Sequence, residues 1–369
     1  MLAESILWIG VAIPLYAFAG YPLALRALGL VIRRQVRKAP VRPRVSLLIP
    51  AYNEARVIRR KIENSLALDY PADRIEIVVV SDGSTDRTVE IARSAGGVRV
   101  LALAQNRGKV AALNAAVPGL QGEIIVFSDA SAMLAPDAVC RLVENFADPA
   151  VGAVSGRYRV VKSDEVNIGA SEEIYWKYEA FVKTQESRVA STMGAHGHLH
   201  AIRKELYPFP SPETINDDYV IPLSVIGRGF RAVHEPSAVV FEEAREMTGF
   251  PRRVRIVAGN FQQLRHLGQL LRPFQPTPLL FFLSHKVIRL FIPFAMLATL
   301  VANLFLISSP GYRILLGAQL LFYLLAVLGL TARLRPRALR LPYYFCMVNS
   351  AAFFGVYYAM TRRRGMAWK

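Results

Sequence analysis

The chain has 369 residues, of which 53% are apolar and 20% charged, and its formal net charge is +17. This composition indicates long apolar segments joined to an ordinary globular part. Much of the positive excess flanks the apolar segments, where basic side chains contact anionic headgroups. Because no aromatic-interleaved RNA motif or zinc-finger spacing accompanies it, we expect no nucleic-acid partner. Cys140 and Cys346 lie far apart, so neither a disulfide nor a cysteine metal site is expected.

The first apolar stretch, residues 5–25, contains no charged side chain. It is about as long as the ~20 residues that cross the hydrocarbon core of a bilayer. A cleaved signal peptide is the alternative, but Glu4 precedes the stretch and the basic residues follow it. The positive-inside rule places that basic flank in the cytoplasm. We therefore expect residues 1–32 to form a membrane helix whose amino terminus lies outside.

Residues 33–250 alternate strand-like and helix-like segments. The predicted strands are 45–49, 75–80, 98–102 and 124–127, and the predicted helices are 53–68, 85–95 and 108–117. This alternation predicts an α/β domain with a mostly parallel sheet that is covered by helices on both faces. Ligands of such sheets bind beyond the carboxyl ends of the strands.

Acidic residues follow two of these strands directly. Asp82, in SDGSTD, comes after residues 75–80, and Asp129, in FSDAS, comes after residues 124–127. A third acidic cluster, Asp217 and Asp218 in TINDDY, opens an apolar run. Any one of them could begin a turn or cap a helix. Three clusters in one globular segment predict a ligand site built from carboxylates.

Several motifs together resemble those of family 2 glycosyltransferases, over about residues 45–263. In chain order they are SLLIPAYNE (46–54), VVSDGSTD (79–86), NRGKVAALN (106–114), FSDAS (127–131), GAHGHLHAIRKELY (194–207) and TINDDYVIPL (214–223). The resemblance implies a GT-A-like (Rossmann-like) domain. It also implies an inverting enzyme that moves a sugar from a nucleotide-sugar donor, with a UDP-sugar expected, to a hydroxyl acceptor.

The resemblance assigns the donor side to the first three motifs. Ala51, Asn53 and Glu54 would face the base and ribose, and Asp82 would contact the base. An ordinary turn at Asp82 and a helix cap at Asn53 are the structural alternatives. Lys109 follows a flexible glycine at a helix start, which suits a diphosphate, although a plain solvated lysine is the alternative.

The metal site implied by the resemblance rests on Asp129. A carboxylate and phosphate oxygens suit Mg²⁺ or Mn²⁺, which would neutralise the leaving diphosphate. The family pattern is Asp-any-Asp, but Ser131 stands at its third position. Polysaccharide-synthesising relatives carry a Gln-x-x-Arg-Trp motif downstream. Here Arg252 and Ile256 replace its Gln and Trp, and Arg255 keeps the arginine as an expected diphosphate clamp.

The resemblance makes the second carboxylate of the TINDDY motif, Asp218, the catalytic base, with Asp217 as the alternative. Adjacent carboxylates beside an apolar segment can raise one pKa toward the range that general base catalysis needs. The structural alternative is that one of them only caps a helix. The expected base would take the proton of the acceptor hydroxyl as its oxygen attacks the anomeric carbon.

On the acceptor side the resemblance points to Gly194, His196 and Gly197. The alternation of His196, His198 and His200 would place three imidazoles on one face of a strand, as a metal cluster could require. Because the family keeps this segment for the acceptor, we favour substrate-lining or packing histidines over zinc.

Residues 251–285 are expected to lie at the membrane interface as amphipathic helices, and residues 286–369 to hold the membrane helices 290–312, 314–332 and 341–361. Three crossings would place the basic tail, residues 362–364, outside, against the charge rule. Either the tail is an exception, or one stretch is re-entrant or interfacial. The expected localisation is the inner cell membrane, multi-pass, with the catalytic domain in the cytoplasm.

Three functions remain open at this point. The first is transfer of single sugars to a lipid-linked intermediate of a cell-surface glycan or exopolysaccharide, with partners in a glycan assembly complex. The second is a processive synthase that also exports its polymer. The incomplete Gln-x-x-Arg-Trp motif and the modest number of helices favour the first. The third is a non-catalytic scaffold that binds nucleotide sugars in a membrane synthase complex, and Ser131 is its only support.

Overall fold

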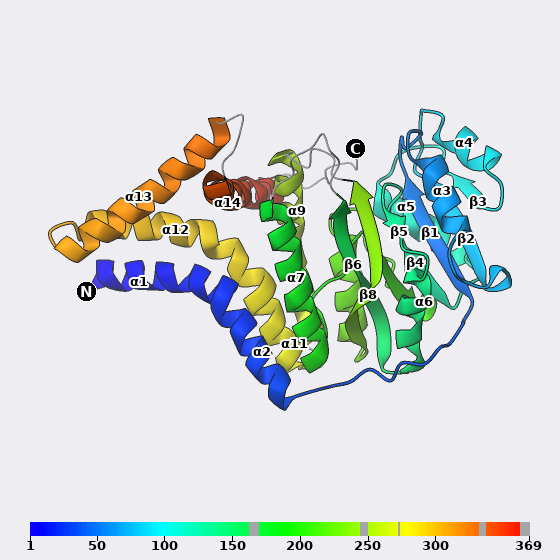
Figure 1. Ribbon diagram of the computed structural model, residues 1–369, viewed down its shortest axis with the longest axis horizontal. Coiled ribbons are helices and arrows are strands. Elements are labelled where there is room, and N and C mark those ends of the chain that lie inside the picture. Colours follow the sequence, from blue (N-terminus) through cyan, green and yellow to red (C-terminus); the bar gives the residue numbers. More distant parts are fainter. Residues whose placement is uncertain (162–169, 244–249, 272–273, 332–336, 362–369) are drawn as a thin grey trace.

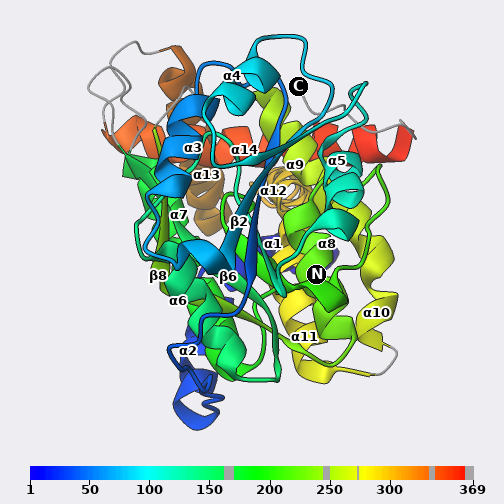
Figure 2. The same cartoon turned by 90° about the vertical axis from the view of Figure 1, so that its right-hand side faces the viewer.

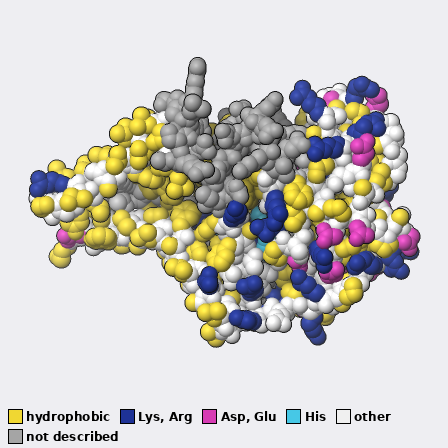
Figure 3. All heavy atoms as spheres, viewed as in Figure 1, with side chains coloured by type: hydrophobic (Ala, Val, Ile, Leu, Met, Phe, Trp, Pro, Cys, Tyr) yellow, Lys and Arg dark blue, Asp and Glu magenta, His cyan; other side chains and the backbone are white. Residues whose placement is uncertain are grey.

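The computed structural model describes residues 1–161, 170–243, 250–271, 274–331 and 337–361. It consists of a sheet domain and a group of long helices that extend away from it (Figure 1). The apolar side chains gather over the part formed by these helices, whereas the charged side chains lie mainly over the sheet domain (Figure 3).

Three helical segments among the described residues are long and apolar enough to cross a membrane. They are Leu2–Val31, Pro276–Leu304 and Pro310–Leu330. The first comprises α1 (Leu2–Leu15), the π-helical turn Tyr16–Gly20 and α2 (Tyr21–Val31). The second comprises α11 (Pro276–Phe282), the π-helical turn Leu283–Val287 and α12 (Ile288–Leu304), and the third lies in α13 (Pro310–Thr331). The chain therefore has the helices of a membrane protein.

The last apolar stretch differs from the expected crossing at 341–361. It forms α14 (Arg337–Thr361), which is not among the candidate spans of the described residues. Helix α12 is seen end-on in Figure 2, whereas α14 runs across that view. Helix α14 packs along α9 (Phe250–Gln262), the predicted interfacial helix. An interfacial position for this stretch was one of the alternatives left open by the charge pattern.

One eight-stranded sheet forms the globular domain, with strand order β3-β2-β1-β4-β7-β6-β8-β5. Strand β1 pairs in parallel with β2 and β4, and β2 pairs in parallel with β3. The antiparallel strand β7 joins this parallel part to β6, which pairs in parallel with β8. The strands are β1 (Val45–Ala51), β2 (Ile75–Ser81), β3 (Arg99–Ala102), β4 (Ile124–Phe127), β5 (Met133–Leu134), β6 (Val151–Val161), β7 (His200–Arg203) and β8 (Arg231–Glu243).

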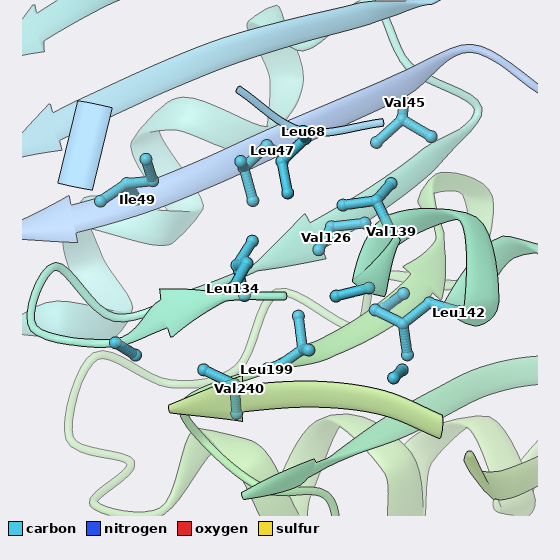
Figure 4. Packing of buried hydrophobic residues seen from close by; sticks show 14 of the residues in the cluster. Val45, Leu47, Ile49, Leu68, Val126, Leu134, Val139, Leu142, Leu199 and Val240 are labelled. Carbon is cyan, nitrogen blue, oxygen red and sulfur yellow. The ribbon is translucent and has the colours of Figure 1, made fainter. Parts of the chain in front are cut away.

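Successive side chains of a strand point to opposite faces of the sheet, and they form one hydrophobic core on each face. Leu47 and Ile49 point to one face of β1, where α3 and α6 cover them, and Leu48 points to the other face, against α5, α7 and α8. Figure 4 shows the first of these clusters. The helices are α3 (Ile58–Leu66), α4 (Thr88–Ser94), α5 (Lys109–Ala116), α6 (Ala138–Val143), α7 (Ala170–Val189), α8 (Asp217–Gly227) and α10 (Gly268–Leu271). The expected α/β fold with helices on both faces is confirmed.

The first helix of the domain begins later than expected. Residues 53–57 are not helical, and α3 starts at Ile58. Asn53 has a φ of 56°, a left-handed conformation that an α-helix does not allow. Asn53 therefore does not cap this helix, and its side chain serves another loop, described below.

Close packing of α1 against α12 depends on Gly10. A Cβ added there would lie 2.2 Å from Thr299 Oγ1 and 3.0 Å from the Ala295 carbonyl oxygen. We expect Gly10→Val to lower the free energy of unfolding by about 1–3 kcal/mol, the usual cost of overpacking. The measurement is thermal unfolding in detergent. Gly317→Val is the matched control, because nothing lies within 4 Å of its added Cβ. Equal melting temperatures of the two variants would contradict the packing argument.

Candidate active site

The carboxyl ends of β1, β2 and β4 meet at one edge of the sheet. The Asp82 N–H donates to the Ala51 carbonyl (2.9 Å), and the Ser128 N–H donates to the Leu48 carbonyl (3.1 Å). These bonds hold the loops after β2 and β4 beside β1. Asp129 and Asp82 therefore leave the sheet at the same edge, on opposite sides of β1.

Lys109 connects carboxylates from two of the predicted clusters. Its Nζ lies 3.0 Å from Asp129 Oδ1 and 3.4 Å from Asp217 Oδ2. Only 16% of the Lys109 side chain is exposed, so it is not the plain solvated lysine of the alternative interpretation. The first residue of α5 thus joins the end of β4 to the start of α8.

The charges at this point stabilise one another. Burial alone would lower the pKa of Lys109, but Asp129 and Asp217 raise it well above its usual value. Burial would raise the pKa of Asp129, but Lys109 and His198 lower it. Asp129 therefore stays ionised and Lys109 stays charged at neutral pH.

Asp218 lies in a different environment from its neighbour Asp217. Burial first, and then the charge of Asp217, raise the pKa of Asp218 to about 6, whereas Lys109 and Lys183 oppose the shift. Asp218 has no ion pair with a described residue, while Asp217 pairs with Lys109. A Cβ added to Gly197 would lie 3.3 Å from Asp218 Oδ2, so the predicted acceptor segment borders this carboxylate directly.

Asp82 has a structural task that the sequence did not suggest. It is fully buried, and its carboxylate accepts the backbone N–H groups of Arg107 (2.9 Å) and Gly108 (2.8 Å). Gly83 has a φ of +66°, and a Cβ added there would lie 2.4 Å from the backbone nitrogen of Asn106. The loop after β2 and the loop before α5 therefore form one unit that presents Lys109.

The predicted base-binding loop is also held by side chains. Asn53 Oδ1 accepts the N–H of Thr85 (2.9 Å), and the Glu54 N–H donates to Thr88 Oγ1 (2.8 Å). Asp86 supports the same junction by accepting the Thr88 N–H (2.9 Å). Ala51 is buried at the end of β1. The structure thus places Ala51, Asn53 and Glu54 beside the Asp82 loop, and their nucleotide contacts stay a prediction.

The histidines of the acceptor segment face different surroundings. His196 is buried among the rings of Tyr158, Trp176 and His234. His198 lies 3.2 Å from Glu242 Oε2, and His200 stacks on Phe127. Burial holds the pKa of His196 well below its usual value. No group of three or more His, Cys, Asp or Glu side chains able to hold a metal exists in the described part of the chain.

Helix α9 is fixed to the segment before Asp217. Asn216 Nδ2 donates to the Ile256 carbonyl (3.1 Å), and the Ile215 N–H donates to Gln262 Oε1 (3.1 Å). Arg255 lies on this helix. Burial lowers its pKa, and the charges of Asp217, Asp129 and Asp218 raise it, so it lies within their electrostatic reach. Its role as a diphosphate clamp stays a prediction.

Sequence reasoning missed two residues of this region, Lys61 and Glu242. Lys61 is buried beneath β4, donates to Ser128 Oγ (2.7 Å), and has a pKa lowered to about 7 by burial. The sequence feature that could have revealed it is the presence of a lysine on the apolar face of α3. Glu242 accepts hydrogen bonds from Ser131 (2.7 Å) and Tyr158 (2.9 Å). Burial would raise its pKa, but His198 and the two hydroxyls lower it to about 2.

The residues fit a divalent cation that is shared with a substrate. Mg²⁺ commonly binds through one or two protein carboxylates together with substrate phosphates, so a complete protein cage is not required. Asp129 is ionised at the strand end, and Glu242 supplies a second carboxylate through its bond to Ser131. The carboxylate that the motif lacks at position 131 is therefore present one hydrogen bond away.

A large surface cavity among the described residues lies elsewhere. It measures about 930 Å³ and includes Arg42, Glu123, Ile124 and Arg203 in its lining, at the amino ends of β1 and β4. None of the predicted site residues lines it. Because ligands of parallel sheets bind at the opposite, carboxyl edge, we assign the function to the carboxylate site.

Comparison with known proteins agrees with this geometry. Residues 46–208 match the family Glycosyl transferase family 2. The chain carries a family 2 glycosyltransferase domain. The matched residues include the Asp82 and Asp129 motifs and the acceptor segment, while Asp217 and Asp218 lie beyond them.

Two curated relatives illustrate the range of the family. The chain is 26% identical over 230 residues to the poly-beta-1,6-N-acetyl-D-glucosamine synthase of Staphylococcus aureus, covering 60% of this chain and 55% of that protein. It is 33% identical over 209 residues to the beta-monoglucosyldiacylglycerol synthase of a Nostoc species, covering 53% and 45%. The chain thus spans about half the length of the curated relatives that it matches.

One solved structure resembles the whole chain. It is a mannosyltransferase from Pyrobaculum calidifontis in complex with GDP-Man and Mn²⁺. The match has a TM-score of 0.73 and 25% identity, and covers 97% of this chain and all of that one. The sheet domain and its helices therefore follow a known glycosyltransferase architecture, and the predicted GT-A-like fold is confirmed.

The contact between the loops after β2 and before α5 can be tested at Gly83. Gly83→Ala would strain a left-handed residue by about 1–2 kcal/mol and also push against the backbone of residues 105–106. We expect the melting temperature to fall and nucleoside diphosphate affinity, measured by calorimetry, to drop about tenfold or more. Gly96→Ala is the control, because its φ is +69° but nothing lies within 4 Å. Unchanged nucleotide affinity in Gly83→Ala would separate this loop from donor binding.

Proposed function

We propose that the protein is an inverting glycosyltransferase that moves a sugar from a nucleoside diphosphate sugar to a hydroxyl acceptor. The observation that carries this proposal is the position of Asp218, which has a raised pKa and lies between the acceptor segment and the Lys109 ion pairs. A carboxylate with a pKa near neutrality can accept a proton during the reaction and release it afterwards.

The donor would bind with its diphosphate at Lys109 and its base near Asp82. Lys109 supplies a buried cation where the leaving group develops charge, and Arg255 supplies a second cation from α9. A UDP-sugar is the expected donor. The related mannosyltransferase was solved with GDP-Man, so the test of donors includes both nucleotides.

The reaction would proceed by direct displacement. The acceptor oxygen attacks the anomeric carbon, the bond from that carbon to the diphosphate oxygen breaks, and the acceptor proton passes to Asp218. Attack from the face opposite the leaving group inverts the configuration. Asp217 is occupied by its ion pair with Lys109, which supports Asp218 as the base.

Asp129 would hold a divalent cation, with Glu242 as a further carboxylate near Ser131. Bound Mg²⁺ or Mn²⁺ would neutralise negative charge on the leaving diphosphate. The low pKa values of both carboxylates keep them ionised for this purpose. The Mn²⁺ in the related mannosyltransferase supports the same chemistry here.

A cytoplasmic catalytic domain at the inner membrane is part of this proposal. The amino terminus and the turn between α12 and α13 lie at one end of the helices, where Tyr312 donates to Glu4 (3.4 Å). With α14 at the interface, three crossings that begin outside return the basic tail, residues 362–364, to the cytoplasm. The conflict with the positive-inside rule then disappears.

A lipid-linked acceptor is favoured because the acceptor segment lies beside the membrane helices. Lys286, from the second candidate span, lies over the ring of Tyr219, the residue after the proposed base. The polymer synthase among the relatives supports the processive alternative. Product length distinguishes the two, since single transfer adds one sugar and a processive synthase yields a long chain. A non-catalytic scaffold would bind nucleotide sugars without turnover.

The base assignment predicts a specific dependence on pH. Asp218 acts as a carboxylate, so kcat/KM should fall about tenfold per unit as the pH drops below its pKa of about 6. Asp218→Asn should lower kcat by about 10²–10⁴ and retain nucleotide binding. The measurement is nucleoside diphosphate release from a panel of UDP- and GDP-sugars in nanodiscs with a membrane lipid extract.

Asp217→Asn provides the control for the pH profile. Its negative charge raises the pKa of Asp218, so removing it should move the acidic limb to lower pH. Full turnover in Asp218→Asn would refute this residue as the base. If the wild-type protein and the variants bind nucleotide but release no nucleoside diphosphate, the result would favour the non-catalytic scaffold.

The metal assignment predicts that Mn²⁺ strengthens nucleoside diphosphate binding only when Asp129 is intact. We expect Asp129→Asn to weaken Mn²⁺ binding in the presence of UDP or GDP by about 100-fold or more, because loss of an outer-shell partner alone costs about 10–100-fold and Asp129 is the proposed direct ligand. Electron paramagnetic resonance of free Mn²⁺ gives the measurement. Asp137→Asn is the control, since that aspartate is exposed and pairs with Arg141. Equal Mn²⁺ binding by both variants would place the cation elsewhere.

A further inference from the structure

Lys286 is a buried cation without a carboxylate partner among the described residues. It lies in the π-helical turn Leu283–Val287 of the second candidate span, and only 8% of it is exposed. Its Nζ lies 4.3 Å from the centre of the Tyr219 ring, and no described residue forms a hydrogen bond or ion pair with it. Ionisable side chains within membrane helices are costly and normally have a partner or a function.

The neighbouring ionisable groups of the same span are all paired. His285 Nδ1 lies 2.6 Å from Glu186 Oε1, and His285 Nε2 lies 3.3 Å from Glu179 Oε2. Arg289 Nη1 lies 2.5 Å from Glu179 Oε1. Glu186 also accepts the Tyr21 hydroxyl (2.7 Å). These contacts use both carboxylates that α7 directs toward the span.

Lys183 also belongs to this cluster. It donates to the carbonyls of Gly194 (2.6 Å) and Ala195 (3.1 Å) and lies within electrostatic reach of Asp218. Lys286 is therefore the lysine of the cluster that has neither a hydrogen bond nor an ion pair with a described residue. An anion that enters beside Lys286 would provide the missing partner.

The position of Lys286 identifies which substrate would carry this anion. The Tyr219 ring that lies under its ammonium also borders the acceptor segment, because a Cβ added to Gly194 would lie 3.0 Å from that ring. Asp218 directly precedes Tyr219. The donor diphosphate is expected at Lys109 and Asp129, on the strand ends. Lys286 therefore lies beside the acceptor segment, over the residue that follows the proposed base.

We propose that Lys286 binds a phosphate group of a lipid-linked acceptor and so positions the acceptor against Asp218. This inference rests on the proposed glycosyltransferase function and specifies its acceptor as a lipid with an anionic phosphate or diphosphate group. The shared chemistry is phosphate, and a lipid is favoured over a soluble anion because the lysine lies within an apolar span. Lys286 is a positioning residue, since it does not touch the reacting atoms.

The test compares lipids that differ only in phosphate, using the full chain in phosphatidylcholine nanodiscs. The pairs are polyprenyl phosphate with the polyprenol of equal length, and phosphatidic acid with diacylglycerol. We expect the wild-type protein to bind at least one phosphate lipid about tenfold or more tightly than its neutral partner, measured as a dose-dependent rise in melting temperature. Lys286→Met should abolish that preference, and Lys286→Arg should keep it.

Arg313→Met is the matched control, because it removes an exposed cation at the far end of the helices, next to Tyr312. It should keep the preference for phosphate. Lys286→Met with an unchanged preference, or a wild-type protein that binds neutral and phosphate lipids equally, would overturn the proposal. Inorganic phosphate that binds as tightly as either lipid would also overturn it, in favour of a soluble anion.

Kinetic measurements distinguish a failure of this proposal from a failure of the proposed function. With a phosphate-bearing acceptor extract, Lys286→Met should raise the acceptor KM by about tenfold or more and change the donor KM little. Lipid binding does not require turnover. Absence of nucleoside diphosphate release from every donor would therefore refute the proposed function, while the lipid preference would still be measured on its own.

Discussion

The site depends on one arrangement of charges, the ammonium of Lys109 between Asp129 and Asp217. These residues come from three places in the chain, the start of α5, the end of β4 and the start of α8, and their side chains are 16%, 25% and 8% exposed. Two carboxylates this close would repel each other without the cation. The lysine therefore permits the sheet edge and α8 to close on each other, and it leaves Asp218 next to them as the carboxylate with a raised pKa.

The same region is fixed to the membrane part from its other side. Asn216 joins α9, which packs along α14, and Lys286 from the second span contacts Tyr219. The residues on both sides of the aspartate pair are thus held by α9 and by a candidate membrane span. A shift of the interfacial helices would move the proposed base relative to the strand ends that hold Asp129. Membrane attachment and the geometry of the site are therefore parts of one structure.

Local pattern was sufficient for the parallel strands β1 to β4, whereas β5 to β8 were not predicted. The strand at 124–127 was predicted at the bounds that the structure has, because a short apolar run followed by Asp marks both the strand and its end. It was not sufficient for the start of α3, where the left-handed Asn53 overrides helix propensity to support the loop at Thr85. Lys61 and Glu242 were missed because their partners lie about 70 and 110 residues away in the chain, and hydrogen bonds at that distance leave no local pattern.

Charge patterning and packing give different information about the position of the last apolar stretch. Hydropathy alone suggested a crossing at 341–361, and the basic tail contradicted it. In the structure, α14 packs along α9, and an aromatic pair between Phe250 and Phe354 joins the two helices. A helix that covers an amphipathic neighbour at the interface buries apolar side chains without crossing the bilayer. The packing along α9 and the composition of α14, which is not among the candidate spans of the described residues, both support the proposed interfacial position.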